Sequence, residues 1–188
     1  MCDIMTEPNR ILPGGYLYMN DILGNPQVMK KVGRLIASIY AEKQIDVIMT
    51  VATKGIPIAY AIADYLNVPV VIVRPDNKVT EGPTVSINYI SGSSKRIQTM
   101  LLSKRSLEVG SKVLVVDDFM KAGGTINGMK SLLDEFNATV AGIAVLIESS
   151  DREERLVDNY VSLLKLAEVD EREKQIQVTK GNYFDLLK

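Results

Sequence analysis

The sequence contains no histidine, so the side chain that most readily exchanges protons near neutral pH is missing. This absence weighs against an enzyme that depends on imidazole as general acid or base. The single cysteine, Cys2, cannot form an internal disulfide. The formal net charge of −1 provides no overall attraction for nucleic acid. No apolar run approaches the roughly 20 residues of a membrane-spanning helix, so we expect a cytoplasmic protein without a membrane anchor.

The composition is that of one folded domain. A chain of 188 residues, 46% hydrophobic and 24% charged, is long enough for one buried α/β core and too short for two ordinary domains. Residues 1–10 lack the basic and apolar regions of a signal peptide, and we interpret them as a polar lead-in.

Short apolar runs alternate with amphipathic segments along the chain. The runs predict strands at 45–51, 68–73, 113–116, 139–147 and 160–166. The amphipathic segments predict helices that begin at Asn25-Pro26, near Pro57 and near Thr125. This alternation is typical of a mostly parallel sheet with helices on its faces. The segment 81–106 mixes β-forming residues with glycine and paired serines, which predicts a mobile hairpin that can close as a lid.

The most informative segment is 113–125, which reads VLVVDDFMKAGGT. Its buried-strand residues lead into two acids and a glycine turn, and a helix follows. A helix N-terminus binds phosphate through its free N–H groups, and Gly123 and Gly124 allow close approach. Asp117 and Asp118 repel phosphate and are better suited to ribose hydroxyls or Mg²⁺. Taken alone, an Asp-Asp pair is also compatible with a simple helix cap and solvent-facing turn.

The two commonest nucleotide-binding motifs, G-x-x-x-x-G-K-[ST] and G-x-G-x-x-G, do not occur in the sequence. The segment instead resembles the phosphoribosyl pyrophosphate motif of type I phosphoribosyltransferases. The resemblance implies that α/β fold, with a mostly parallel central sheet flanked by helices, and a ligand accompanied by Mg²⁺ near Asp117 and Asp118. It assigns the ligand site to Asp117, Asp118, Phe119, Met120, Lys121, Ala122, Gly123, Gly124 and Thr125.

Segments 51–55, 73–78 and 84–99 extend the resemblance to the effector domains of the purine operon repressors of Gram-positive bacteria. This resemblance implies further ligand contacts from a pyrophosphate loop, a strand-end arginine, the lid and an aromatic residue: Ala52, Thr53, Lys54, Gly55, Arg74, Lys78, Ser93, Ser94 and Tyr16. Taken alone, Lys54, Arg74 and Lys78 are also compatible with solvated surface charges, and Tyr16 with a packing role.

Position 121 bears on whether the chain is an enzyme. In the 6-oxopurine phosphoribosyltransferases the corresponding position carries an acid that assists proton transfer, and a protonated Lys121 cannot accept that proton. This departure excludes one mechanism and not catalysis in general. The resemblance implies a domain that senses phosphoribosyl pyrophosphate without turning it over. The alternative is a purine phosphoribosyltransferase of the xanthine or adenine type, and guanosine tetraphosphate is a second candidate effector from its charge alone.

The family resemblance also concerns DNA. The repressors carry an amino-terminal winged-helix domain, whereas the match here starts near Pro8, so we expect residues 1–188 to form one effector domain that reaches DNA only through an absent domain. The resemblance implies a homodimer. A basic cluster in the lid segment leaves open a third class, an RNA-binding regulator, beside ordinary surface charge: Lys95, Arg96, Lys104 and Arg105.

Overall fold

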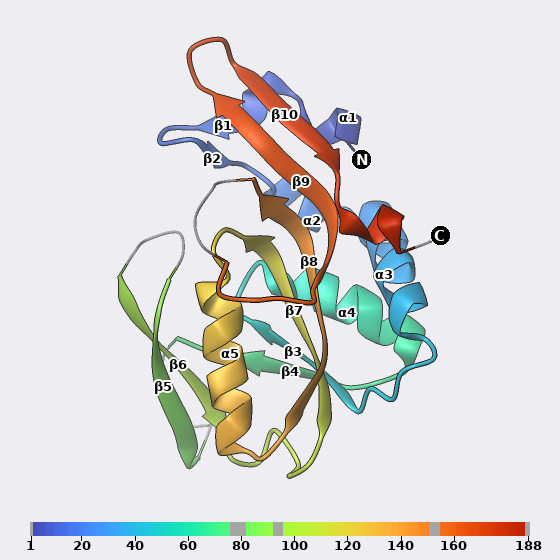
Figure 1. The fold of residues 1–188 in the computed structure, drawn as a ribbon, viewed down its shortest axis with the longest axis vertical. Helices are drawn as coiled ribbons and strands as arrows, with labels where there is room; N and C mark the ends of the chain where they lie inside the picture. The colour runs from blue at the N-terminus through green and yellow to red at the C-terminus, as the bar shows by residue number, and fades with distance from the viewer. Residues whose placement is uncertain (1, 76–81, 92–95, 151–154, 187–188) are drawn as a thin grey trace.

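The computed structural model describes residues 2–75, 82–91, 96–150 and 155–186. A six-stranded sheet with the order β10-β9-β8-β7-β3-β4 forms its centre (Figure 1). In chain order these strands are β3 (Val47–Val51), β4 (Val70–Val73), β7 (Lys112–Met120), β8 (Thr139–Ser149), β9 (Val161–Asp170) and β10 (Gln175–Lys180). Neighbouring strands from β4 to β9 run parallel, and β10 is antiparallel to β9. The prediction of a mostly parallel sheet is confirmed.

Helices cover both faces of the sheet because successive side chains of a strand point to opposite faces. On β7, Leu114 and Val116 belong to the apolar cluster that includes α3 (Pro26–Tyr40) and α4 (Gly55–Leu66). Val113 and Val115 belong to a second cluster with α5 (Gly124–Glu135). The apolar run therefore fills two cores, which is why it lacks the alternation of a half-exposed strand.

Local sequence signals explain where the helices begin. The Asn25 side chain accepts hydrogen bonds from the N–H groups of Gln27 at 3.0 Å and Val28 at 3.2 Å, and Pro26 occupies the first turn of α3. The helix predicted near Pro57 begins at Gly55, and the helix predicted near Thr125 begins at Gly124. All three predicted helices are confirmed.

The predicted hairpin consists of β5 (Thr84–Ile90) and β6 (Ile97–Ser103) and lies against α5 (Figure 1). The approach is close at Gly128, where an added Cβ would lie 2.9 Å from the Tyr89 Cβ. A backbone bridge between Arg74 and Leu101 also joins the hairpin to the end of β4. Two elements therefore contact the strands of the hairpin, α5 at Tyr89 and the end of β4 at Leu101, while residues 92–95 lie outside the described part of the chain.

The N-terminal segment is packed against the domain, so the prediction of a polar lead-in is wrong. Residues 2–24, here called the N-terminal arm, contain α1 (Cys2–Met5), the 3-10 turn η1 (Pro8–Arg10), β1 (Ile11–Leu12), β2 (Tyr16–Leu17) and α2 (Asn20–Leu23). Met5 is fully buried, and Arg10 donates to both oxygens of the Asp21 carboxylate at 2.7 and 2.9 Å. The guanidinium hydrogen bond lowers the pKa of Asp21. The sequence pattern missed this ion pair because its partners belong to separate short elements.

Several predicted strand boundaries require correction. The acids at 117 and 118 lie inside β7, which continues to Met120, because the parallel partner β8 also extends to Ser149. The strand predicted at 160–166 begins one residue later and reaches Asp170, where it pairs with β10, a strand that the patterns did not predict. A short turn, η3 (Asn182–Asp185), follows β10. Within the described ranges, none of the helices is both long and apolar enough to cross a membrane.

Candidate functional site

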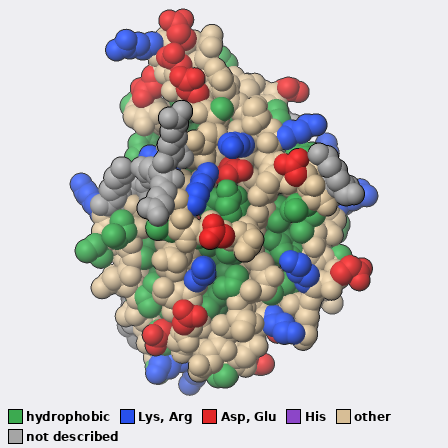
Figure 2. All heavy atoms as spheres, viewed as in Figure 1, with side chains coloured by type: hydrophobic (Ala, Val, Ile, Leu, Met, Phe, Trp, Pro, Cys, Tyr) green, Lys and Arg blue, Asp and Glu red, His purple; other side chains and the backbone are tan. Residues whose placement is uncertain are grey.

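A cavity of about 710 Å³ lies where β3 and β7 end. Its walls come from four places: the N-terminal arm, the loop after β3, the β5–β6 hairpin and the second half of β9. The far end of the β9–β10 hairpin offers a poor surface for an anionic ligand, because acidic side chains gather there around the turn that contains Asp170, Glu171 and Glu173 (Figure 2). The cavity at the strand ends is therefore the candidate site, as expected for an open parallel sheet.

Two adjacent carboxyl groups lie in the floor of the cavity. Asp117 is 8% exposed, and its Oδ1 accepts the backbone N–H of Asp118 at 3.0 Å. Burial, and then the charge of Asp118, raise the pKa of Asp117 well above its ordinary value. Burial also raises the pKa of Asp118, although the Asp117 side chain and the nearby Lys54 charge act in the opposite direction. Burial and mutual repulsion therefore make the two negative charges unfavourable in the free protein. Hydrogen bonds from ligand hydroxyls, or a bound cation, would stabilise them.

The start of α5 forms a second, smaller cavity of about 50 Å³ beside the acids. Its lining includes Gly123, Gly124, Thr125 and Ile126. The N–H of Asn127 donates to the Gly123 carbonyl at 2.8 Å, so the N–H groups of residues 124–126 precede the first hydrogen bond of the helix. A helix start of this kind binds an anionic group such as a phosphate.

Gly123 is required for this loop for two separate reasons. Its φ of 93° is in the left-handed region, and an added Cβ would lie 2.8 Å from the Val157 Cγ2.

We expect Gly123→Ala to lower the free energy of unfolding more than Gly110→Ala does. Gly110 is a matched control, since its φ is 82° but an added Cβ would have no neighbour within 4 Å. Both variants should lose about 1–2 kcal/mol from the backbone conformation, and the position-123 variant about 1–3 kcal/mol more from the clash with Val157. Urea denaturation of the three proteins measures the difference. Equal losses would contradict close packing at this loop.

The loop after β3 forms the opposite wall of the cavity. Ala52, Thr53 and Lys54 line it, and the peptide bond between Ala52 and Thr53 is cis. Gly55 follows this loop at the start of α4 and packs closely on β3, because an added Cβ would lie 2.1 Å from the Thr50 Oγ1. The Lys54 charge is near enough to Asp118 to oppose the rise of the Asp118 pKa, so the two sides of the cavity are electrostatically linked.

The hairpin contributes side chains that the sequence patterns did not identify. Tyr89, Ser91 and Gln98 line the cavity, and the Tyr89 hydroxyl donates to the Gln98 Oε1 at 2.8 Å. Burial and the charge of Asp117 raise the pKa of Tyr89, while a hydrogen bond with Thr125 opposes the rise. The lid was predicted for segment 81–106 with ligand contacts from Ser93 and Ser94, whereas Tyr89 and Gln98 belong to β5 and β6 and Ser91 directly follows β5.

The remaining wall consists of the N-terminal arm and β9. Tyr16 lines the cavity and is 56% exposed, so the packing role that its residue type favours is wrong. The other contributors are Gly14, Gly15, Leu17 and Met19 of the arm, and Leu166, Ala167, Glu168 and Val169 of β9. This mostly apolar wall faces the acidic floor and can hold a planar group attached to a sugar.

Most of the predicted site residues meet in these two cavities. Asp117, Asp118, Phe119, Lys121 and Thr125 line the larger one, and Met120, Gly123 and Gly124 line the smaller one. Gly55, Arg74 and Ala122 belong to neither lining, and Arg74 forms its backbone bridge to the hairpin instead. Lys78, Ser93 and Ser94 lie outside the described residues.

Comparison with known sequences gives the class of protein. A family profile described as "Phosphoribosyl transferase domain" matches residues 19–179, which include nearly the whole central sheet. The chain therefore belongs to the phosphoribosyltransferase domain family.

Within that family the chain groups with the PurR regulators of purine biosynthesis. It is 66% identical over 184 residues to the purine biosynthesis transcriptional repressor PurR of Bacillus subtilis (strain 168), covering 98% of this chain and 65% of that protein. It is 55% identical over 185 residues to the transcriptional activator PurR of Lactococcus lactis subsp. lactis (strain IL1403), covering 98% and 68% of the two chains. The chain thus spans about two thirds of the length of these relatives.

Solved structures agree on the fold. The adenine phosphoribosyltransferase of Thermoanaerobacter pseudethanolicus superposes with a TM-score of 0.73, covering 87% of this chain and 97% of that chain at 21% sequence identity. At this identity the likeness shows the fold alone. The predicted type I phosphoribosyltransferase fold is confirmed.

Proposed function

We propose that this chain is the effector-binding domain of a cytoplasmic regulator of purine biosynthesis and that its ligand is phosphoribosyl pyrophosphate. The observation that carries the proposal is two adjoining cavities that together combine an acid pair, a helix start and the loop 52–54. A phosphate, a ribose with two hydroxyls and a diphosphate require these three kinds of group. The high identity to PurR regulators along almost the whole chain supports a regulatory role.

Each part of the ligand has a suitable partner in the cavity. The 5-phosphate suits the helix start at Gly124 and Thr125, where N–H groups and a hydroxyl are available. The ribose hydroxyls suit the carboxyl oxygens of Asp117 and Asp118, which accept hydrogen bonds. The diphosphate suits Lys54 and the backbone around it on the opposite wall.

The residues also fit a magnesium ion that arrives with the ligand. Among the described residues no group of three acidic, histidine or cysteine side chains is arranged to hold a metal, and the floor of the cavity offers the Asp117–Asp118 pair. Mg²⁺ commonly takes one or two carboxylates and completes its shell with phosphate oxygens and water. Asp117 and Asp118 would hold the ion against the diphosphate, and the ion would neutralise charge on both.

We propose binding without turnover. Lys121 lines the cavity where the 6-oxopurine enzymes carry an acid, and the chain has no histidine to replace it. The two PurR relatives are named as a repressor and an activator, so a domain of this kind is compatible with either sign of regulation. We further propose that the domain is a homodimer and that DNA is contacted through another part of the regulator. Guanosine tetraphosphate, another highly charged ligand, is the candidate competitor.

Calorimetric titration tests this function directly. We expect saturable binding of phosphoribosyl pyrophosphate in the presence of Mg²⁺, weaker binding after chelation of the metal, and displacement by guanosine tetraphosphate. Adenine, guanine, hypoxanthine and xanthine are then added in turn while pyrophosphate release is assayed. Release with any base would make the chain a phosphoribosyltransferase, and no binding at all would contradict the proposal.

A further inference from the structure

Residues 155–157 contact the ligand-binding loop at three successive positions. The Arg155 Nη1 donates to the Lys121 carbonyl, and the Leu156 N–H donates to the Ala122 carbonyl at 2.9 Å. Val157 is 2% exposed and packs against Gly123. These residues are more than 30 positions from the loop in sequence, and Arg155 itself lines neither cavity.

The second terminal nitrogen of the Arg155 guanidinium is held by a buried carboxylate. The Arg155 Nη2 lies 3.3 Å from the Glu148 Oε2 and also donates to the Ser149 carbonyl. Glu148 is 6% exposed and accepts the Tyr160 hydroxyl at 2.6 Å and the Ser162 hydroxyl at 2.7 Å. Burial and the neighbouring Glu148 raise the pKa of Tyr160 to about 12, so its hydroxyl remains a donor at neutral pH.

This anchor has a consequence for the loop backbone. In a planar trans peptide the carbonyl and the following N–H point in opposite directions. Because the carbonyls of Lys121 and Ala122 are turned toward residues 155–156, the N–H groups of Ala122 and Gly123 point away from them. The backbone of residues 121–123, just before the start of α5, is thus held by Arg155 on the side opposite to these N–H groups. Arg155 is in turn held by Glu148, which belongs to β8.

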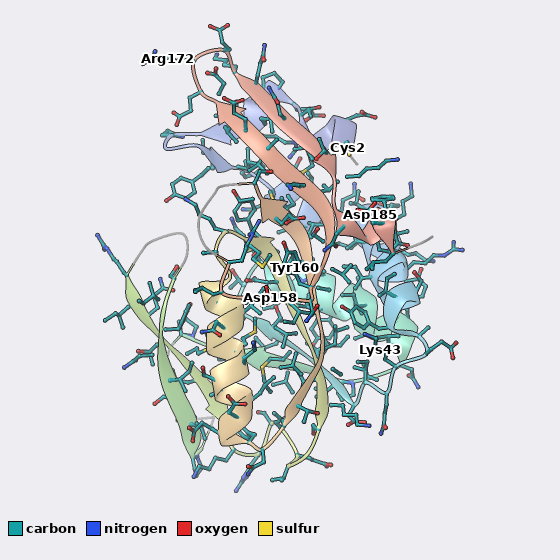
Figure 3. The ribbon with its side chains drawn as sticks, viewed as in Figure 1. Cys2, Lys43, Asp158, Tyr160, Arg172 and Asp185 are labelled. Carbon is teal, nitrogen blue, oxygen red and sulfur yellow. The ribbon has the colours of Figure 1, made fainter. Side chains whose placement is uncertain are left out.

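We propose that Arg155 is a positioning residue of the ligand site: held by Glu148, it fixes the 121–123 loop in the conformation that binds the phosphate of the ribose 5-phosphate part of the ligand. The proposal rests on the function proposed above for this cavity. It predicts that Arg155 acts on the sugar-phosphate half of the site and leaves the diphosphate wall at 52–54 unaffected. Tyr160, which contacts the same Glu148 oxygen as Arg155, lies in the middle of the molecule, whereas Arg172 lies at the tip of the β9–β10 hairpin (Figure 3). Arg172 is therefore a distant control of the same residue type.

The test compares Arg155→Ala, Arg155→Lys, Glu148→Gln and the control Arg172→Ala by calorimetry with ribose 5-phosphate and, separately, with Mg²⁺-pyrophosphate. We expect Arg155→Ala to weaken ribose 5-phosphate binding about 10- to 100-fold, the loss typical for a charged hydrogen bond, with pyrophosphate affinity within about twofold of wild type. Arg155→Lys should lose less, because an ammonium can still donate to one carbonyl. Glu148→Gln keeps the shape of the buried side chain and should give a loss in the same direction.

Amide hydrogen exchange of Leu156 and Asn127, whose N–H groups donate to the Ala122 and Gly123 carbonyls, supplies a readout that needs no ligand. We expect faster exchange there in Arg155→Ala and Glu148→Gln, with the strands of the central sheet unchanged, and wild-type rates in Arg172→Ala. Unchanged exchange in both variants, or an equal loss of affinity for the two ligands, would overturn the positioning role. If the wild-type domain binds neither of these ligands nor phosphoribosyl pyrophosphate itself, the proposed function fails, and the exchange rates alone decide whether Arg155 holds the loop.

Discussion

Replacing Asp118 by alanine is expected to weaken the binding of phosphoribosyl pyrophosphate by at least about 100-fold. If the carboxylate accepts two ribose hydroxyls, its removal leaves both without a charged acceptor, and each such hydrogen bond contributes about 1.5–3 kcal/mol. The fold should tolerate the change, because Asp118 is only partly buried and its pKa is raised, which means that its charge is unfavourable in the free protein. Calorimetry with Mg²⁺ and the ligand measures the loss.

Two further variants separate the contact from general charge effects. Asp134→Asn removes a carboxylate from an exposed position on α5 and should leave affinity unchanged. Asp118→Asn keeps one acceptor oxygen and should fall between the wild type and the alanine variant. Wild-type affinity in Asp118→Ala would contradict the assignment of the acids to ribose.

The central sheet and its three main helices were predictable because their signals are local. The run Val113–Val116 is apolar at every position, and Asn25-Pro26 carries both cap and first-turn chemistry. β10 has only two apolar residues, Ile176 and Val178, among its six positions, and it lies at the edge of the sheet. Its alternating pattern is therefore too short to predict a strand. The N-terminal arm is built from elements of two to four residues, too short to produce any periodic pattern.

The candidate site likewise contains residues that the sequence identifies and residues that only the fold brings together. The acids and the glycine turn were recognisable because nine consecutive residues carry most of that chemistry. Tyr89 and Gln98 were missed because only the docking of the hairpin on α5 brings them to Thr125. Arg155 carries no local signal at all, since its partners Glu148 and Lys121 are set by the parallel pairing of β7 with β8. Tertiary contacts of this kind follow from the fold and not from sequence spacing.

The arrangement of the cavity suggests why such a fold suits a sensor. The acid floor belongs to the rigid sheet, whereas two of the walls come from the N-terminal arm and the hairpin, which lie outside it. A ligand that contacts floor and walls together favours the conformation in which they are closest. Regulation requires that the ligand bind two states of the protein with different affinity, and contacts to separately attached walls provide such a difference.

Asp117→Asn is expected to stabilise the free domain at neutral pH while weakening ligand binding about 10- to 100-fold. Burial and the adjacent Asp118 charge raise the pKa of Asp117, so the folded protein favours its protonated form. The stability associated with that proton is fully present below the unfolded-state pKa and is lost as the pH rises through the folded-state pKa. Asparagine is uncharged at every pH and avoids this loss, and its oxygen can still accept the Asp118 N–H.

The pH profile distinguishes this account from a simple packing effect. At pH 7 the variant should melt about 3 °C above wild type, the shift that about 1 kcal/mol gives in a domain of this size. Below about pH 4, near the ordinary carboxyl pKa, the two melting temperatures should converge, because Asp117 is then protonated in the wild type as well. A difference in melting temperature that stays constant with pH would mean that the amide packs better than the carboxyl group. It would also mean that repulsion between the two acids does not destabilise the wild type. If instead the variant melted below wild type at pH 7, the Asp117 carboxylate would be stabilising the fold, and the reason offered here for its affinity for cations and hydroxyls would fail.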